Sequence, residues 1–384
     1  GSYIEGLVGT PRFINPILAA TDVDRDLARL LYSGLLRYND SGQLTEDLAS
    51  GIEHSADEKT LTVSLKENLR FDDGQPLTSE DVAFTISAIQ NPAWRSPLWR
   101  AFQDIEVKTP DPQTVILNLK TPTPARIHIF TVGIIPKHIW ENVDPLNADR
   151  AVWNLKPVGS GPFKFKSLSK TGDGILSALK LVRNDAFHFS TPYLGEITLR
   201  FFPDFDEALR ALREHAVQGV SFIPARLISK IPTKGFTVQR LNMPHYTAIF
   251  FQDRNNAALR EIAVRQALAL AIDRTAISKL APGMVLTDGP FHPGQIGLVS
   301  TLPPTPPDPK KAALLLEAGG WKKKGDVWAK GGKELGLYVS SEAANKDFLA
   351  QYFKKAKGNL YEGANNDITD KREEVVRVQD DVVA

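Results

Sequence analysis

Cysteine is absent from the 384 residues of the chain, which excludes disulfides, thiolate metal sites and a cysteine nucleophile. Long apolar runs are absent too: no run reaches about 18 residues, so we expect no membrane-spanning helix. A signal-peptide pattern is also missing, and the start, Gly1-Ser2-Tyr3, is interpreted as a mature or trimmed end. The formal net charge is only +1, which argues against a nucleic-acid partner held through its phosphates.

Motifs of catalysis and metal binding are missing as well. None of the seven histidines stands in an H-x-x-x-H or H-E-x-x-H pattern, so a zinc hydrolase has no visible ligands. His138 has no second ligand at helical or hairpin spacing, and we expect a packed or surface histidine. No Walker A loop occurs, so nucleotide hydrolysis would belong to another subunit. The 45 acidic residues leave a carboxylate-pair glycosidase open, but no motif favours one.

The chain is otherwise that of an ordinary globular protein. Apolar residues make up 42% and charged residues 24%. A length of 384 residues is too great for one core, so two or three domains are expected. Proline clusters at 121–124 and 302–309 are typical of extended connectors.

The stretch from Lys59 to Ile89 is the most informative part of the sequence. Residues 61–65 alternate apolar and polar side chains, which predicts a half-buried strand. A turn is expected at Phe71-Asp72-Asp73-Gly74, because glycine takes positive φ freely. Thr78 stands three residues before Asp81 and ahead of an apolar helical stripe, which predicts an N-capped helix. Residues 105–107 and 114–119 alternate as a hairpin.

This stretch resembles the signature of the family 5 extracellular solute-binding proteins, the peptide and nickel receptors of ABC importers. The matching residues are Ser55, Asp57, Thr60, Leu65, Lys66, Phe71, Asp73, Gly74, Pro76, Leu77, Thr78, Asp81, Val82, Phe84 and Thr85. Many matches at fixed spacing make the resemblance specific. It is close over residues 1–340 and weak beyond them.

Other segments carry the same resemblance. Pro157 to Phe163, PVGSGPF, is similar to the family's crossover turn; a nucleophile elbow would need G-x-S-x-G, and Pro162 would block the helix that must follow. Residues 259–274 resemble a single family helix, and 369–383 resemble a later one. A further helix is expected from Asp308-Pro309 to Gly319 or Gly320. Strands are expected at 4–8, 179–183, 196–202, 237–241, 245–252 and 335–340, and helices at 24–32 and 205–215.

The resemblance implies a fold class and a division of the chain. The fold is α/β, a two-lobed periplasmic-binding-protein-like fold of class II, cluster C type, with an extra α+β subdomain inserted in lobe one. Lobe one would comprise residues 1–47 and 158–243, the inserted subdomain 48–157, and lobe two 244–384, with its end returning to lobe one.

The resemblance also implies the site. From lobe one, the ligand cleft would be lined by Ala19, Ala20, Thr21 and Asp22. Tyr246 and Ser340 would line it from near the hinge. Asp22, Asp24 and Asp26 alternate like a calcium loop, but the sixth and twelfth positions hold leucine and serine, so they are interpreted as helix-start acids. We expect no metal, no cofactor and no catalytic residue.

The function expected from the resemblance is that of a receptor rather than an enzyme. It would be a monomer outside the cytoplasm, in the periplasm or at the outer face of the membrane, with any lipid anchor on a segment outside this chain. It would capture a small ligand between its lobes, foremost a peptide, and deliver it to ABC permease and ATPase subunits. In peptide-binding relatives a lobe-two acid pairs with the peptide amino terminus, and no counterpart is identified here. The alternatives are a nickel or other metal-chelate receptor, and an exported hydrolase or surface-adhesion protein on the same scaffold.

Overall fold

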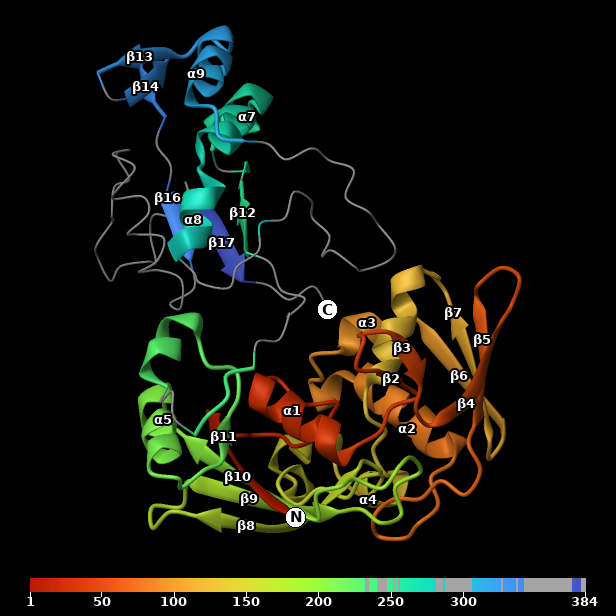
Figure 1. Ribbon diagram of the computed structural model, residues 1–384. Coiled ribbons are helices and arrows are strands. Elements are labelled where there is room, and N and C mark those ends of the chain that lie inside the picture. The colour runs from red at the N-terminus through yellow and green to blue at the C-terminus, as the bar shows by residue number, and fades with distance from the viewer. Residues whose placement is uncertain are drawn as a thin grey trace. The chain divides into compact units, whose positions relative to one another are not determined.

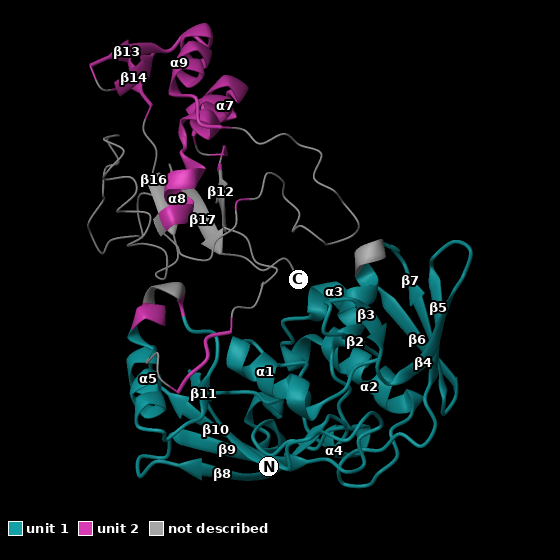
Figure 2. Ribbon diagram, viewed as in Figure 1, with its two compact units in different colours: residues 1–223, 230–232 teal, residues 224–229, 233–384 magenta. Residues whose placement is uncertain are grey.

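The structure of the chain is a computed structural model in which two compact units are distinguished. It describes residues 1–231, 235–239, 247–251, 253–254, 256–280, 286, 306–325, 327–335, 338–341 and 375–380. For some of these residues it describes the backbone but not the side chain, namely 124–125, 225–226, 247–250, 280, 338–341 and 375–380. Unit 1 is Gly1–Ile223 with Lys230–Pro232, and unit 2 is Pro224–Ser229 with Thr233–Ala384 (Figure 2). None of the described helices is both long enough and apolar enough to cross a membrane.

A five-stranded sheet in the order β11-β1-β10-β9-β8 is the first layer of unit 1 (Figure 1). Its strands are β1 (Ser2–Val8), β8 (Phe163–Lys170), β9 (Leu176–Arg183), β10 (Glu196–Phe202) and β11 (Gly219–Val220). The first strand of the chain is parallel to both of its neighbours, β10 and β11, whereas β9 is antiparallel to β10 and β8. The helix α5 (Phe205–Arg213) contacts β1, β10 and β11. The start of the chain and its residues beyond 162 therefore build one sheet.

A second sheet of unit 1 is antiparallel, in the order β4-β5-β7-β6. Its strands are β4 (Ala49–His54), β5 (Thr60–Leu65), β6 (Ile105–Asp111) and β7 (Thr114–Leu119), so the predicted strand and hairpin are confirmed. The helix α2 (Ser79–Gln90) contacts β6 and β7. It begins after Thr78 as predicted, and the Asp81 carboxylate accepts the Thr78 N–H at 2.9 Å.

Shorter elements complete unit 1. The helices are α1 (Asp22–Leu31), α3 (Trp99–Phe102) and α4 (Lys137–Trp140), and the remaining strands are β2 (Leu36–Tyr38) and β3 (Leu44–Glu46), which pair with each other. The 3-10 turns are Pro92–Trp94, Pro124–Thr131, Pro145–Arg150, Val152–Asn154 and, where the chain passes between the units, Ala225–Lys230.

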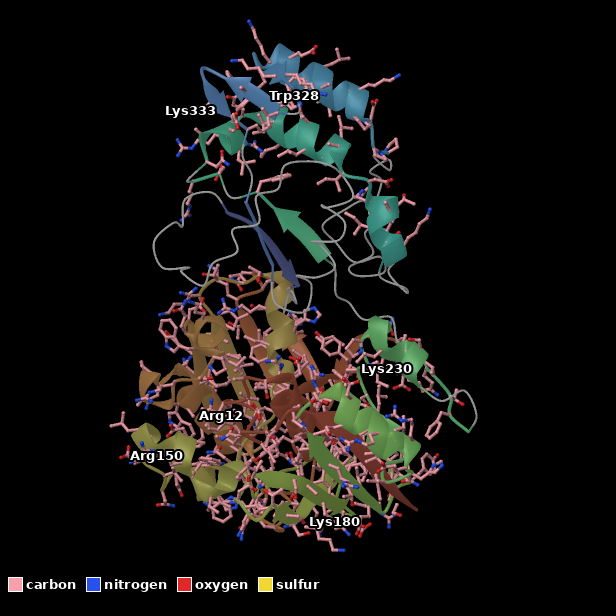
Figure 3. The ribbon with its side chains drawn as sticks, turned by 90° about the vertical axis from the view of Figure 1, so that its left-hand side faces the viewer. Arg12, Arg150, Lys180, Lys230, Trp328 and Lys333 are labelled. Atoms are coloured by element: carbon pink, nitrogen blue, oxygen red, sulfur yellow. The ribbon has the colours of Figure 1, made fainter. Side chains whose placement is uncertain are left out.

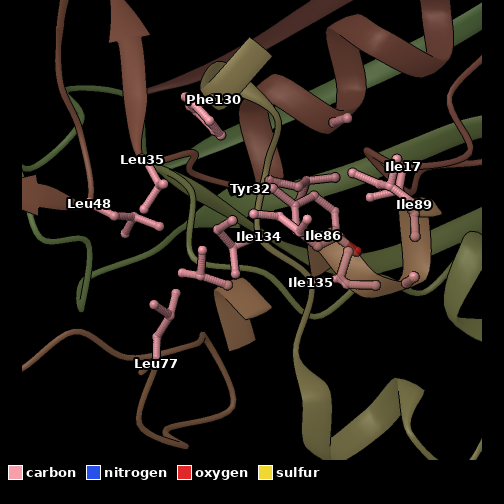
Figure 4. Packing of buried hydrophobic residues seen from close by; sticks show 14 of the residues in the cluster. Ile17, Tyr32, Leu35, Leu48, Leu77, Ile86, Ile89, Phe130, Ile134 and Ile135 are labelled. Atoms are coloured by element: carbon pink, nitrogen blue, oxygen red, sulfur yellow. The ribbon is translucent and has the colours of Figure 1, made fainter. Parts of the chain in front are cut away.

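One hydrophobic cluster runs through unit 1 and joins its two sheets. Tyr32, just after α1, packs with Ile86 of α2 and with Ile134 (Figure 4). Leu179 of β9 and Val115 of β7 belong to the same cluster and are fully buried. The part of the chain that we predicted as an insert therefore shares its core with the rest of unit 1. The division into residues 1–47, 48–157, 158–243 and 244–384 stays a prediction.

Unit 2 has a core of its own, where α7 packs on α9 through Val264, Ala267, Ala312 and Leu316. Its helices are α6 (Ala257–Arg260), α7 (Ile262–Ala271), α8 (Arg274–Leu280) and α9 (Pro309–Ala318). One sheet has the order β13-β14-β15, with strands Lys322–Lys324, Val327–Lys330 and Lys333–Glu334; the other has the order β12-β17-β16, with strands Thr247–Phe250, Val375–Asp380 and Tyr338–Ser341. The predicted start of α9 is confirmed, because the Asp308 carboxylate accepts the Lys311 N–H at 2.9 Å.

Three predicted elements differ from the structure. The helix expected over residues 259–274 is broken at Glu261 and Ile272, where the backbone is extended. Glu261 is held there because its carboxylate accepts Nε1–H of Trp321 at 3.2 Å and pairs with Lys330 Nζ at 2.9 Å. A strand was expected at residues 237–241. Residues 237–239 do not form one, and no described strand pairs with them, whereas residues 240–241 lie outside the described residues.

The third difference is at the end of the chain. Residues 369–383 resemble a family helix, but Val375–Asp380 form strand β17. This strand is parallel to β16 and antiparallel to β12. Three of its six residues are valine, and β-branched side chains favour a strand because they are restricted in a helix. The prediction of a helix there is wrong.

Candidate functional site

The predicted site residues of unit 1 lie where the loop after β1 meets helix α1. Ala19 is buried, whereas Ala20, Thr21 and Asp22 are exposed. Thr21 is the N-cap of α1, and its hydroxyl accepts the Asp24 N–H at 3.2 Å. The interpretation of Asp22 and Asp24 as helix-start acids is confirmed, because both lie in the first turn of α1. The structure thus presents three neighbouring residues to solvent at the positive end of a helix.

Asp24 fixes the shape of this loop. It is fully buried, and its Oδ1 accepts the backbone N–H groups of Arg12 at 2.8 Å and Phe13 at 3.1 Å. Its Oδ2 accepts those of Thr21 at 3.1 Å and Ala20 at 3.4 Å. A buried carboxylate is costly unless it is hydrogen-bonded, and here all four bonds go to the loop. The sequence reasoning missed this role of Asp24.

Further contacts hold the exposed residues in place. The Arg25 guanidinium donates to the Ala20 carbonyl at 3.0 Å and pairs with Asp22 Oδ1 at 2.6 Å. The buried Ser96 hydroxyl, which follows the 3-10 turn Pro92–Trp94, donates to the Ile17 carbonyl at 2.6 Å. Arg12, labelled in Figure 3, is exposed, and its guanidinium carbon lies 5.3 Å from the ring centroid of Phe13. The loop is therefore ordered before any ligand binds.

The two remaining predicted site residues belong to unit 2. Tyr246 lies outside the described residues. Ser340 lies in β16, where its backbone is paired with that of Arg377 in β17. The grouping of these two with Ala19 to Asp22 stays a prediction.

The Gly159-Ser160-Gly161 turn packs against the end of α1. The Gly161 N–H donates to the Leu31 carbonyl at 2.9 Å. A side chain at Gly159 would place its Cβ 1.9 Å from the Leu31 carbonyl oxygen, and one at Gly161 would place it 2.6 Å from the Leu31 carbonyl carbon. Ser160 is buried, and its hydroxyl oxygen accepts the Ser33 N–H at 3.3 Å. Both glycines serve a close backbone approach, and Ser160 is a structural residue rather than a nucleophile at a cleft.

The Phe71 to Gly74 turn contacts the same crossover. The Asp72 N–H donates to the Gly159 carbonyl at 2.8 Å, and the Gly159 N–H donates to Asp72 Oδ2 at 3.2 Å. Burial raises the pKa of Asp72 from 3.8 to about 6. His138 Nε2 lies 2.8 Å from Asp73 Oδ2, so this exposed histidine has a hydrogen-bond partner. In the part of the chain that the structure describes, no group of three histidine or acidic residues is arranged to hold a metal ion.

Comparison with known families gives one match that covers most of the chain. The model of "Bacterial extracellular solute-binding proteins, family 5 Middle" matches residues 43–358. Among curated proteins, the oligopeptide-binding protein AppA of Bacillus subtilis is 27% identical over 368 residues, which are 90% of this chain and 64% of AppA. The chain thus spans just under two thirds of the length of this relative.

Solved structures give the same result. NikZ of Campylobacter jejuni, in complex with Ni(L-His), is similar at a TM-score of 0.76 and 25% identity, over 100% of this chain and 74% of NikZ. AppA of Bacillus subtilis, in complex with a nonapeptide, is similar at a TM-score of 0.72 and 25% identity, over 99% of this chain and 74% of AppA. These likenesses confirm the predicted fold class, the two-lobed α/β fold of periplasmic binding proteins.

Proposed function

The chain belongs to the bacterial extracellular solute-binding proteins of family 5, and from this membership we propose that it is a receptor for an ABC importer. It captures a small ligand outside the cytoplasm, as a monomer, and delivers it to membrane permease and ATPase subunits. The family match over residues 43–358 is the observation that carries the proposal, because it extends over parts of both units. The transport energy comes from the partner ATPase, and the receptor itself performs no catalysis.

A peptide is the first candidate ligand. The proposal rests on the likeness to AppA, whose solved structure holds a nonapeptide. A chelated metal ion such as a nickel–histidine complex is the second candidate, because the likeness to NikZ has the higher TM-score of the two. Both ligands are polar and carry a carboxylate group, which backbone N–H groups can bind.

The ligand would bind between the two predicted lobes. From unit 1 we assign Ala19, Ala20, Thr21 and Asp22 to the site, because the last three are exposed on a loop that Asp24 holds rigid. From unit 2 we assign Tyr246 and Ser340. Preorganisation of the loop lowers the entropy that binding costs, since the loop does not have to be ordered when the ligand arrives.

Mass spectrometry of the small molecules released on denaturing the purified protein tests the ligand class. We expect a peptide or a metal chelate at up to one equivalent. The matched binding experiment compares the rise in melting temperature with a peptide mixture and with a nickel–histidine complex, because a ligand that binds the folded state raises its stability. Turnover of the peptides, or no binding of either class, would contradict the proposal.

The site assignment has its own test. Ala20→Trp places a large side chain on the exposed loop and is expected to reduce the ligand-induced rise in melting temperature. Ala186→Trp is the matched control, because Ala186 is also exposed on a loop of unit 1 and is not assigned to the site. Equal ligand responses in both variants would show that Ala20 is not at the site.

A further inference from the structure

A pocket of about 380 Å³ opens on unit 1 beside the β2–β3 pair. Its wall includes Arg37 of β2, Thr45 and Glu46 of β3, Lys66 just after β5, and Phe189. Arg37 lies opposite Thr45 in the β2–β3 ladder, so both side chains are on one face of this ribbon. None of the residues assigned above to the ligand of the importer lines the pocket.

Two cations share one aromatic ring in this pocket. The Arg37 guanidinium carbon and the Lys66 Nζ each lie 4.1 Å from the ring centroid of Phe189. Among the residues that the structure describes, none forms a hydrogen bond or ion pair with either charged group. A phenyl ring attracts a cation through its quadrupole, but it does not neutralise the charge. The pocket therefore brings two cations to one ring, and neither has a carboxylate in direct contact among the described residues.

Two acids near the pocket, Asp47 and Glu46, act on the charge of Lys66 without a direct contact to it. Asp47 is buried, and its Oδ1 lies 2.7 Å from Nε2 of the half-buried His188, so its carboxylate is engaged in another contact. Glu46 is exposed at the rim. Lys66 is half-buried, and its burial, reinforced by Arg37 and opposed by Asp47 and Glu46, lowers the pKa of the Lys66 ammonium group. An anionic group between the two cations would relieve both the repulsion and the lost hydration.

We propose that this pocket binds a small molecule through a carboxylate or phosphate group. The guanidinium of Arg37 can donate two parallel hydrogen bonds to such an oxyanion, and the ammonium of Lys66 supplies a second charge-assisted bond. Phe189 holds both side chains in position, which reduces the rotamer entropy lost on binding. The site is separate from the ligand site of the proposed receptor function.

Calorimetric titration of the whole chain with inorganic phosphate and with succinate, at constant ionic strength set with chloride, tests the proposal. We expect saturable binding of at least one of the two probes. Phosphate binding without succinate binding would assign a phosphate group, and the reverse would assign a carboxylate. Lys66→Gln and Arg37→Gln are each expected to weaken binding by about tenfold, the order expected when one charge-assisted hydrogen bond is lost.

Matched variants make the result specific to this pocket. Lys156→Gln removes an exposed positive charge elsewhere on unit 1 and is expected to leave binding unchanged. Glu46→Gln removes the negative charge at the rim and is expected to strengthen binding by about threefold, a typical effect of one exposed charge. Phe189→Leu keeps an apolar side chain but removes the cation–ring contacts, and it is expected to weaken binding without loss of the fold.

The outcomes that overturn the proposal are equally defined. No heat of binding with either probe in the wild-type chain contradicts it, and so does equal binding in the wild type and in Lys66→Gln. Ala20→Trp, which tests the receptor site, is expected to bind the anion as the wild type does. A failure of the receptor proposal and a failure of this one are thus seen in different variants.

Discussion

Asp24 connects the start of the chain to the exposed loop that we assign to the ligand. All four hydrogen bonds of its buried carboxylate are accepted from backbone N–H groups of this loop. Asp24→Asn keeps the size of the side chain but turns one acceptor oxygen into an NH2 donor that faces two N–H groups. We expect a loss of about 2–4 kcal/mol in the free energy of unfolding, because buried groups lose charge-assisted bonds. Urea denaturation measures this loss.

The neighbouring acid is the control for this substitution. Asp22 is exposed and pairs only with Arg25 across one helical turn, so Asp22→Asn should cost less than about 0.5 kcal/mol. A cost of Asp24→Asn as small as that of Asp22→Asn would show that the loop does not depend on the buried carboxylate.

Asp72 gives the chain a pH-dependent term in its stability. Its pKa is about 6 in the folded protein and 3.8 when exposed, so between these values the folded state keeps a proton that the unfolded state releases. Stability therefore falls as the pH rises from about 4 to about 6, and the loss is complete above that window. Asp72→Asn cannot ionise and keeps an oxygen for the Gly159 N–H. The difference in the free energy of unfolding between Asp72→Asn and the wild type should therefore be about 1–2 kcal/mol more in favour of the variant at pH 8 than at pH 4.

Urea denaturation at both pH values measures this difference. Asp149→Asn is the matched control, because Asp149 is exposed and its removal leaves the pH dependence as it is in the wild type. If Asp72→Asn and the wild type show the same difference between pH 4 and pH 8, Asp72 is not the group responsible.

Elements with strong local signals were predicted well from the sequence. Two helix starts were predicted from local signals: Thr78 with Asp81 for α2, and Asp308 with Pro309 for α9. Such signals are visible in the sequence because their residues lie within one helical turn of each other. The alternation over residues 61–65 located β5 for the same reason. The role of Ala20 to Asp22 in the candidate site stays a prediction, and the buried contacts of Asp24 that hold them were not foreseen.

Elements that depend on distant partners were not predicted. The break at Glu261 depends on Trp321 and Lys330, about sixty residues later, and no local pattern announces it. β17 needs β12 and β16 on either side of it, so a helical likeness of residues 369–383 was overridden by the sheet. Arg37, Lys66 and Phe189 come from three separate segments of the chain. Their contact therefore has no local pattern in the sequence that would predict it.

The crossover turn at Gly159 and Gly161 tolerates no side chain. Gly161→Ala would force its Cβ against the backbone of Leu31 and Tyr32, with distances of 2.6 and 2.7 Å. We expect a loss of about 3 kcal/mol or more, the upper range for overpacking, because backbone atoms on both sides cannot move aside freely. Thermal unfolding followed by circular dichroism measures it. Gly172→Ala is the control, since a Cβ there meets nothing within 4 Å, and it should unfold within a degree or two of the wild type, as about 0.5 kcal/mol implies.

The whole molecule consists of two units that the chain connects within a short stretch. It passes between them at residues 223–224, 229–230 and 232–233. Few connections make relative motion of two units inexpensive, and a ligand that contacts both binds the closed arrangement better. We therefore expect the true ligand to reduce the radius of gyration in small-angle X-ray scattering. An unchanged radius at saturation, in protein first freed of co-purified ligand by unfolding and refolding, would contradict the closure.

The place of β1 in its sheet has a consequence for the newly made chain. Within unit 1 it is the strand that is synthesised first, yet it pairs on one side with β10, where Ser2 faces Glu196, and on the other with β11. At about 5–20 residues per second, both partners follow only after about 10–40 s. During that time the first strand has no native neighbour, and closing so long a loop slows folding further. If the chain acts outside the cytoplasm as we propose, it has to cross a membrane before it folds, and such a delay favours that order, because the sheet cannot close until most of unit 1 has been made.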